Sequence, residues 1–269
     1  MNPAPEPAPD DEAVGAAARY DALHAEQTGD VAFYAAEAAR SGGPVLEVGC
    51  GTARIALAIA AAGIDVTGLD RSGALLAGAA AKRRSAPPAV ARRLALVRAD
   101  MRAYAFRRPF AQVLMPFRVF QAMLSIPDQL AALAAARAAL APGGRLVLDL
   151  FDPRLDVLAE AADGPAPLAA TGRGFRDPRG EWRERVAASY DLESQIVDLT
   201  YLYERVGEGG VVAERAFERL RVRYFTRWEF EHLLARAGYE VEALYGGWDG
   251  RPPDAEGEDM IWIAKRRDE

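Results

Sequence analysis

Short apolar runs alternate with helical stretches over much of the chain. Runs such as Val45–Val48 and Phe110–Met115 are bounded by turn residues, which is typical of buried strands, and the segments between them have the apolar spacing of helices. This alternation predicts parallel βαβ units and a doubly wound α/β sheet. Strands are predicted at 45–48, 65–69, 94–97, 110–115, 145–150, 239–244 and 260–264, and helices at about 52–62, up to about 84, and at about 127–140.

The pattern changes between about 181 and 225. Leu220, Val222 and Tyr224 alternate strictly with arginines, which is the period of antiparallel strands that have one face in water. The glycine-rich segment 207–210 supplies a hairpin turn between two of these strands. The pattern predicts a three-stranded antiparallel insertion after the fifth parallel strand, within residues 153–225.

The two ends of the chain differ in character. Residues 1–12 are acidic and proline-rich, and they predict a disordered tail rather than a signal peptide. Residues 13–40 predict two helical segments, which leaves 41–152 and 226–269 for the α/β core. Thr226 and Glu229 form a capping-box pattern at the start of the last helix, and Gly238 is expected to end it.

Charge and composition narrow the range of possible partners. The chain of 269 residues has a formal net charge of −6, which disfavours nucleic acid as a partner. The longest apolar run is too short to span a bilayer, so no membrane role is expected. No group of residues has metal-ligand spacing, and the single cysteine, Cys50, excludes an internal disulfide. A cytoplasmic monomer or homodimer is the default expectation.

The segment Glu47–Arg54 carries the main chemical signal. It joins the first predicted strand to the first helix, at the edge where open parallel sheets bind ligands. Gly49 and Gly51 let the backbone approach a ligand closely. A nicotinamide or flavin fingerprint would need Gly or Ala at position 54, and Arg54 counts against a dinucleotide.

The same segment resembles the S-adenosylmethionine (SAM) binding loop of class I methyltransferases, E/D-x-G-x-G-x-G, with Ala53 in place of the last glycine. The resemblance implies a Rossmann-like sheet of seven strands whose last strand is antiparallel, with SAM as cofactor. It makes the helices at 13–40 a lid and the insertion a substrate cover. The segment Pro142–Gly144 before the fifth strand is similar to the family as well.

The resemblance also assigns cofactor contacts. Glu47 suits the ammonium of the methionine part, Asp70 the ribose hydroxyls, and Asp100 with Met101 the adenine. The full set expected at the cofactor is Tyr20, Glu47, Gly49, Cys50, Gly51, Asp70, Arg71, Asp100, Met101 and Pro116. For Cys50, a small residue that fits between two glycines is the alternative to a reactive thiol.

The methyl acceptor is expected where the fourth strand ends. Methyltransferases that act on adenine or glutamine carry Asn/Asp-Pro-Pro-Tyr/Phe there, and Met115–Pro116 does not match, which argues against both acceptors. Arg118 either holds a carboxylate or phosphate of the substrate or pairs with a neighbouring acid. The residues expected at the acceptor are Phe117, Arg118, Gln121, Tyr203 and Tyr224, although packing within the sheet is the alternative for the tyrosines.

Methyl transfer needs alignment and exclusion of water, and a base only for a poorly acidic hydroxyl or a protonated amine. The candidates for catalytic roles are Tyr20, His24 and Arg118. His24 either faces the pocket or lies on an exposed helix surface, and His232 is expected at the surface. The function predicted is methyl transfer from SAM to N, O or C of a small molecule. A SAM-binding sensor or partner subunit is the first alternative, and a nicotinamide-linked oxidoreductase is the second.

Overall fold

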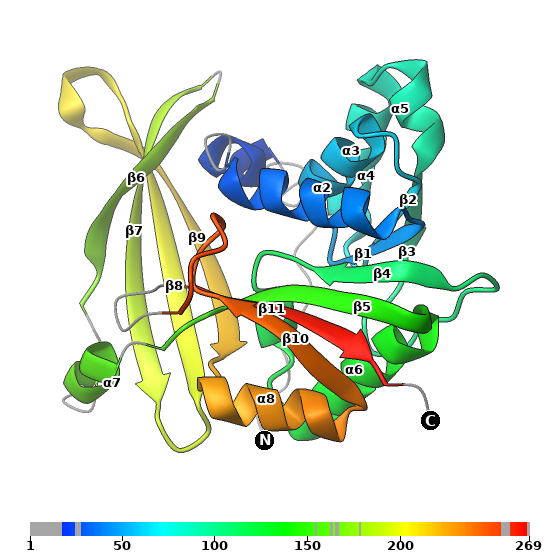
Figure 1. Cartoon of the computed structure of the whole chain (residues 1–269). Helices are drawn as coiled ribbons and strands as arrows, with labels where there is room; N and C mark the ends of the chain where they lie inside the picture. Colours follow the sequence, from blue (N-terminus) through cyan, green and yellow to red (C-terminus); the bar gives the residue numbers. More distant parts are fainter. Residues whose placement is uncertain are drawn as a thin grey trace.

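Two separate sheets organise the chain (Figure 1). The computed structural model describes residues 18–24, 28–153, 155–161, 164, 167–177, 179–253 and 259–267, so the predicted tail at 1–12 lies outside the described residues. One sheet has seven strands and the other has four. The N-terminal helical segment that ends at His24 lies between the smaller sheet and the helices of the larger one (Figure 1).

The seven-stranded sheet has the order β10-β11-β5-β4-β1-β2-β3. Strand β11 is antiparallel to both of its neighbours, and the pairs among β1 to β5 are parallel, which confirms the predicted sheet and its antiparallel last strand. The strands are β1 (Val45–Val48), β2 (Val66–Asp70), β3 (Leu94–Arg98), β4 (Phe110–Met115), β5 (Leu140–Phe151), β10 (Tyr239–Tyr245) and β11 (Asp259–Arg266).

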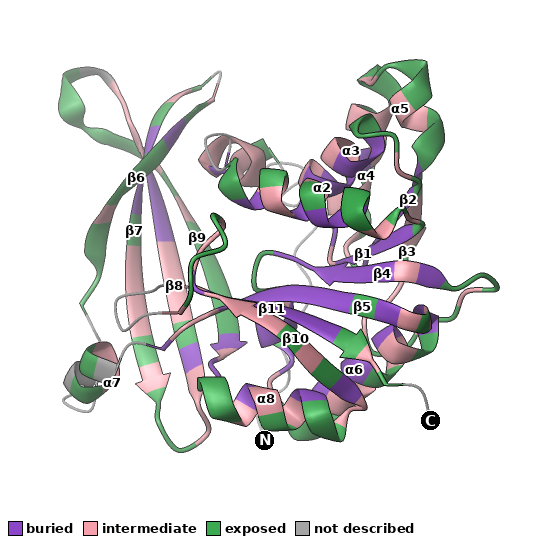
Figure 2. Cartoon of the chain, viewed as in Figure 1, coloured by how far each residue is buried: buried purple, intermediate pink, exposed green. Residues whose placement is uncertain are grey.

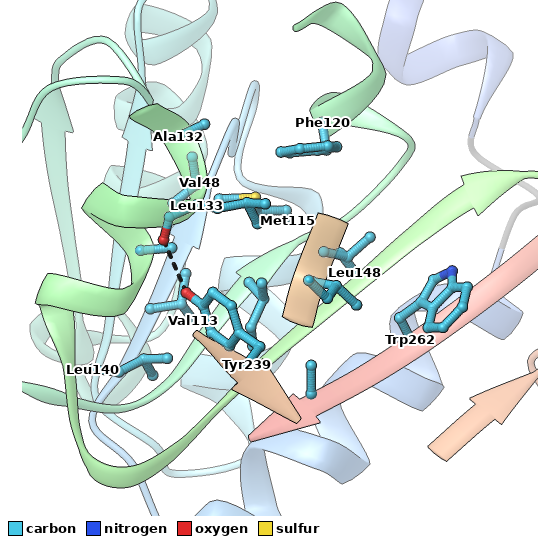
Figure 3. Close-up of a cluster of buried hydrophobic side chains, with 14 of the residues drawn as sticks. Val48, Val113, Met115, Phe120, Ala132, Leu133, Leu140, Leu148, Tyr239 and Trp262 are labelled. Atoms are coloured by element: carbon cyan, nitrogen blue, oxygen red, sulfur yellow. Dashed lines mark hydrogen bonds between the residues drawn. The ribbon is translucent and has the colours of Figure 1, made fainter. Parts of the chain in front are cut away.

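Helices cover both faces of this sheet. On one face, α2 (Gly29–Ser41) and α3 (Arg54–Ala61) join a core cluster with β1, β4 and β5, and α4 (Gly73–Ser85) and α5 (Pro88–Arg93) lie at its side. On the other face, α6 (Ile126–Ala139) and α8 (Arg227–Arg236) pack over a second cluster. Figure 3 shows part of this second cluster, where the Tyr239 hydroxyl donates a hydrogen bond to the Leu133 carbonyl at 3.0 Å.

The insertion has four strands in the order β6-β7-β8-β9, so the predicted three-stranded meander was wrong by one strand. The strands are β6 (Ala169–Asp177), β7 (Gly180–Asp191), β8 (Ile196–Val206) and β9 (Val212–Arg223), and α7 (Leu155–Ala161) precedes them. Strand β6 escaped prediction because it is an edge strand with one buried side chain, Phe175, and a register shift between Ala170 and Gly174. A bulged polar strand of this kind lacks the alternation that reveals the others.

The smaller sheet turns one face toward the N-terminal helix. Phe175, Trp182 and Tyr203 form a buried cluster on that face, and Leu23 of the helix packs against it. The strands of the larger sheet are mostly buried, whereas those of the smaller sheet are largely exposed or intermediate (Figure 2). The N-terminal helix therefore packs against one part of the four-stranded sheet, and another part of the sheet contacts the α/β core directly.

The start of α8 departs from the predicted capping box. Thr226 occupies the N-cap position, but its side chain makes no capping hydrogen bond. Glu229 instead accepts hydrogen bonds from Gln195 at 2.9 Å and from Arg223 at 3.1 Å, which ties the helix to the smaller sheet. Gly238 has a φ of +83° directly after the helix, as a C-terminal glycine requires. Within the described ranges, no helix is long and apolar enough to cross a membrane.

Candidate active site

The loop after β1 is built from alternating left-handed residues. Gly49, Gly51 and Ala53 have φ values of 75°, 53° and 62°. The amides of Gly49 and Cys50 both donate to the Leu69 carbonyl, at 2.7 and 3.0 Å. Ala53 also adopts the left-handed conformation. The family pattern therefore has glycine at this position because the backbone must adopt a positive φ. Alanine meets that requirement at a cost of about 1 kcal/mol.

Asp70 braces this loop from the neighbouring strand. One carboxylate oxygen accepts the Gly51 amide at 2.9 Å, and the other accepts the Ser72 amide at 2.8 Å. The side chain is buried at the end of β2, as the sequence placed it. Arg71 follows, and its carbonyl accepts a hydrogen bond from Arg98. Asp70, to which the resemblance assigns the ribose hydroxyls, therefore also holds the loop after β1 in place.

Glu47 lies beneath the loop with an unsatisfied oxygen. Its side chain is buried, and Oε2 has no hydrogen-bond partner among the residues that the structure describes. Burial raises the pKa of Glu47 to about 8, and the Ala56 amide and Arg54 only partly oppose this shift. A buried carboxylate with a free oxygen is suited to bind a cationic group, which fits the ammonium of SAM.

Cys50 is a packing residue in this structure. It is buried, and a Cβ at Gly68 of β2 would lie 2.8 Å from its sulfur. Burial raises the pKa of the thiol, and the nearby acids Glu47 and Asp70 raise it further. Because the thiolate is the reactive form, this site favours the alternative that a small residue fits here.

Asp100 and Met101 lie in the turn after β3. Arg102 donates two side-chain hydrogen bonds to the Asp100 carboxylate, at 2.9 and 2.7 Å, and these hold its pKa down to about 2. Met101 is half-buried against the core cluster on the α6 side. An adenine amine at this position would share the carboxylate with Arg102.

Two polar contacts join the N-terminal region to the loop. Thr52 donates to Asp21 at 2.6 Å, and Lys82 of α4 pairs with the same carboxylate at 2.6 Å. Arg54 binds Asp30 of α2 through both guanidinium nitrogens, at 2.9 and 2.5 Å. The sequence analysis used Arg54 only to exclude dinucleotides and so missed this second role.

Tyr20, His24 and Phe117 form an aromatic cluster beside the loop. The His24 ring centroid lies 4.4 Å from that of Tyr20 and 4.7 Å from that of Phe117, and Arg54 lies 5.6 Å above the Phe117 ring. His24 is buried, not exposed, and burial lowers its pKa. Burial raises the pKa of Tyr20 to about 12, so its phenol stays protonated.

The tautomer of His24 follows from its partner. Its Nδ1 lies 2.7 Å from the Tyr20 carbonyl oxygen, and a carbonyl can only accept. Nδ1 therefore carries the proton, and the neutral ring keeps a lone pair on Nε2.

The loop after β4 is held by Asp149, which the sequence analysis did not select. Phe117 and Arg118 have φ values of 59° and 61°, which is unusual for residues with side chains. Asp149 accepts their amides at 2.7 and 3.0 Å and the Tyr34 hydroxyl at 2.5 Å. Burial raises the pKa of Asp149 to about 6. A lone acid in the apolar run Leu146–Phe151 was the signal that marked it.

The remaining predicted acceptor residues are dispersed. Arg118 pairs with Asp259 at 2.7 Å and stays partly exposed. Gln121 is fully buried, and its amide group bonds to the backbone of Phe151 and Arg223. Tyr224 packs in a separate cluster with Val197 and Val222. Pro116, which was expected at the cofactor and not at the acceptor, is buried. Tyr203 lies on the inner face of the smaller sheet, near the N-terminal helix.

Comparisons with known proteins agree with this geometry. Residues 45–144 match the family described as a methyltransferase domain. The cypemycin N-terminal methyltransferase of a Streptomyces species is 27% identical over 240 residues, which cover 89% of each chain.

Solved structures share the fold. The CcbJ methyltransferase from Streptomyces caelestis aligns with a TM-score of 0.74 at 20% identity and covers 90% of both chains. SAM-bound CalS10, an amino pentose methyltransferase from Micromonospora echinaspora, aligns with a TM-score of 0.66 at 22% identity. This second alignment covers 98% of this chain and all (100%) of CalS10. The whole described chain, including the four-stranded sheet, therefore lies within a fold of known methyltransferases.

Proposed function

Because this chain is a class I SAM-dependent methyltransferase, we propose that it methylates an amino nitrogen of a small acceptor molecule. Two of the similar proteins carry names that point to amines: an N-terminal methyltransferase and an amino pentose methyltransferase. The buried neutral His24 beside the strand-end loop supports the same class of acceptor.

The loop after β1 and its supports would hold the cofactor. We assign the ammonium to Glu47, close backbone approach to Gly49, Cys50 and Gly51, and the ribose to Asp70. The adenine goes to Asp100 and Met101, with Arg71, Pro116 and Tyr20 at the edges. The orphaned Oε2 of Glu47 is the observation that fits this assignment. When bound, SAM supplies a methyl group made electrophilic by the positive sulfur.

The N-terminal region acts as the lid in this proposal, and residues 153–225 act as the substrate cover. Asp21 and Asp30 fasten the lid through Thr52, Lys82 and Arg54, so the lid closes directly over the cofactor loop. The rings of Tyr20 and Phe117 then exclude water from the reacting groups. Arg118 is left to hold an anionic group of the acceptor.

His24 is the proposed proton acceptor. The amine proposal depends on the observation that its ring is buried and neutral. An amine that binds as its ammonium ion must lose a proton before its nitrogen lone pair can attack the methyl group, and a neutral imidazole with a free Nε2 can take that proton. Burial keeps the pKa of His24 below its usual value, so the ring is in the acceptor form at neutral pH. The hydrogen bond from Nδ1 to Tyr20 orients it.

The test is transfer of labelled methyl from SAM to a panel of primary amines and matched alcohols. We expect amines to be methylated, and His24→Gln to lower kcat about 100-fold with SAM affinity retained. His232→Gln is the control, because His232 is exposed on α8. Label on alcohols alone, or a His24→Gln variant as active as wild type, contradicts the proposal.

We also propose a cytoplasmic monomer or homodimer that acts on free small molecules and not on nucleic acid. The net charge of −6 supports the last point, because an anionic chain gains no attraction toward phosphate backbones.

A further inference from the structure

A buried carboxylate on the inner face of the smaller sheet has no role in the functions described above. The side chain of Glu184 in β7 is only 3% exposed. Its ion-pair partner, Arg173, places its Nε 3.9 Å from Oε1, which is beyond hydrogen-bonding distance. Burying a charge that has only a long ion pair is costly, and such groups are commonly kept for binding.

Aromatic rings surround this carboxylate. Glu184 pairs in register with Tyr203, and Tyr201 lies one pair further along the same face. The two tyrosine rings stack at 6.3 Å with an interplanar angle of 9°. Burial raises the pKa of Tyr201, and Glu184 is the next largest cause, so the two groups lie within electrostatic range. Stacked aromatic faces beside a carboxylate are the elements that bind organic ammonium ions.

The same group faces the proposed active site. Arg118 of the strand-end loop also influences the pKa of Tyr201, and Arg173 contributes to the lowered pKa of His24. Ala22 and Leu23 of the lid pack, as Tyr201 does, against the cluster of Phe175, Trp182 and Tyr203. A cavity of about 460 Å³ is lined by Arg173, Trp182 and Glu184, among other residues of β6 and β7. Lid and sheet therefore meet beside Glu184 and Tyr201, and Arg118 of the loop lies within electrostatic range of Tyr201.

We propose that Glu184 and the ring of Tyr201 form an ammonium-binding subsite that selects the acceptor. This inference rests on the proposed function, since the subsite would receive an amine acceptor as its ammonium ion. Arg173 is a competing cation in this arrangement, because its Nε lies 3.9 Å from the Glu184 carboxylate.

Because Arg173 competes with the ligand for Glu184, variants of the two residues should change ammonium binding in opposite directions. The probe is benzylamine, which is an ammonium ion at neutral pH, titrated into the full-length protein saturated with S-adenosylhomocysteine (SAH). Benzyl alcohol is the neutral match. We expect Glu184→Gln to weaken benzylamine binding about tenfold, because a charge-assisted contact is lost. Arg173→Gln should strengthen binding about threefold by removing the competing charge. Benzyl alcohol should bind weakly to all variants.

Matched controls separate this role from a structural one. Glu193→Gln lies in the turn between β7 and β8 with its side chain exposed and away from the cavity lining, so it should leave binding unchanged. Tyr201→Leu removes the ring without touching the carboxylate and should weaken binding by a similar factor. Equal binding of amine and alcohol, or unchanged binding in Glu184→Gln, overturns the subsite. Glu184-dependent binding in a protein that methylates only alcohols supports the subsite and contradicts amine transfer.

Discussion

The proposed cofactor loop and the proposed acceptor side of the site are built by different means. The loop after β1 is held by contacts within one sheet: the amides of Gly49 and Cys50 bond to Leu69, and that of Gly51 bonds to Asp70. The acceptor side draws on three distant segments, namely the N-terminal helix, the loop at Phe117 and Arg118, and the four-stranded sheet. Backbone geometry defines the first region, and side chains define the second.

This difference explains why the sequence predicts the loop after β1 and does not predict the acceptor side. A loop that depends on φ values demands glycine at set positions, and that demand appears directly in the sequence. A chamber made of side chains from separate elements tolerates many residue types and so carries no fixed spacing. Relatives that share the loop can therefore differ in acceptor, and variants should separate the two halves of the site.

The largest expected effect concerns Gly49. A Cβ there would overlap the side chain of Val119. We expect Gly49→Ala to lower SAH affinity about 100-fold, because relieving about 1–3 kcal/mol of overpacking strain must move the loop. Gly63→Ala is the control, since Gly63 has a φ of +89° with no atom within 4 Å of its Cβ position. Gly63→Ala should lower the stability of the protein and leave its SAH affinity unchanged. Equal SAH affinity in both variants contradicts a backbone-defined loop.

Asp149 tests the acceptor half. We expect Asp149→Asn to lower kcat/KM for the acceptor about 30-fold while SAH affinity stays within twofold, because an amide can accept only one of the two loop N–H groups. Asp152→Asn, at the same end of β5, is the control. A parallel loss of SAH affinity in Asp149→Asn would contradict the separation of the acceptor half from the cofactor half.

Asp149 also predicts pH dependence. Burial raises its pKa to about 6, so activity should decrease as the pH falls through 6 and the carboxyl stops accepting both amides. The folded state holds this proton more tightly than an unfolded chain with a pKa of about 3.9. Its contribution to the free energy of unfolding therefore decreases between about pH 4 and pH 6 and stays low above that range. Denaturant titrations of Asp149→Asn should lack this slope.

Glu47 gives a smaller effect on the cofactor half. Burial raises its pKa to about 8, so the free protein carries a protonated Glu47 at neutral pH. Binding of an ammonium favours the ionised form and releases that proton, so SAH affinity should rise between pH 6 and pH 8 by up to about tenfold per unit. Calorimetry on Glu47→Gln should show a flat profile, and Glu37→Gln should keep the slope. A flat wild-type profile contradicts the ammonium assignment.

The smallest effect is expected at Arg118. Arg118→Ala should raise the acceptor KM about fivefold and leave SAH affinity unchanged, because a partly exposed ionic contact contributes little. Asp259→Asn decides between the two roles. It should lower the KM if Arg118 holds an anion of the acceptor, and it should mimic Arg118→Ala if the ion pair alone matters.

Local signals predicted most of the larger sheet and all of the loop. The alternation of strands and helices gave their order, and Gly49, Gly51 and Asp70 lie together as expected. Edge strand β6 has no comparable signal, because its single buried side chain leaves no alternation. The capping box failed for a related reason: Glu229 finds better partners in Gln195 and Arg223, which are distant in sequence.

The sequence by itself determined the α/β sheet and the cofactor loop, because both follow from short-range periodicity and from residues that must adopt positive φ. Only the tertiary structure decided that His24 is buried, that Asp149 holds the loop at Phe117, and that Glu184 is buried in the smaller sheet. His24 lies more than a hundred positions from Asp149 and Glu184 in the sequence. Their chemistry depends on desolvation and on neighbours that only the folded chain brings within reach.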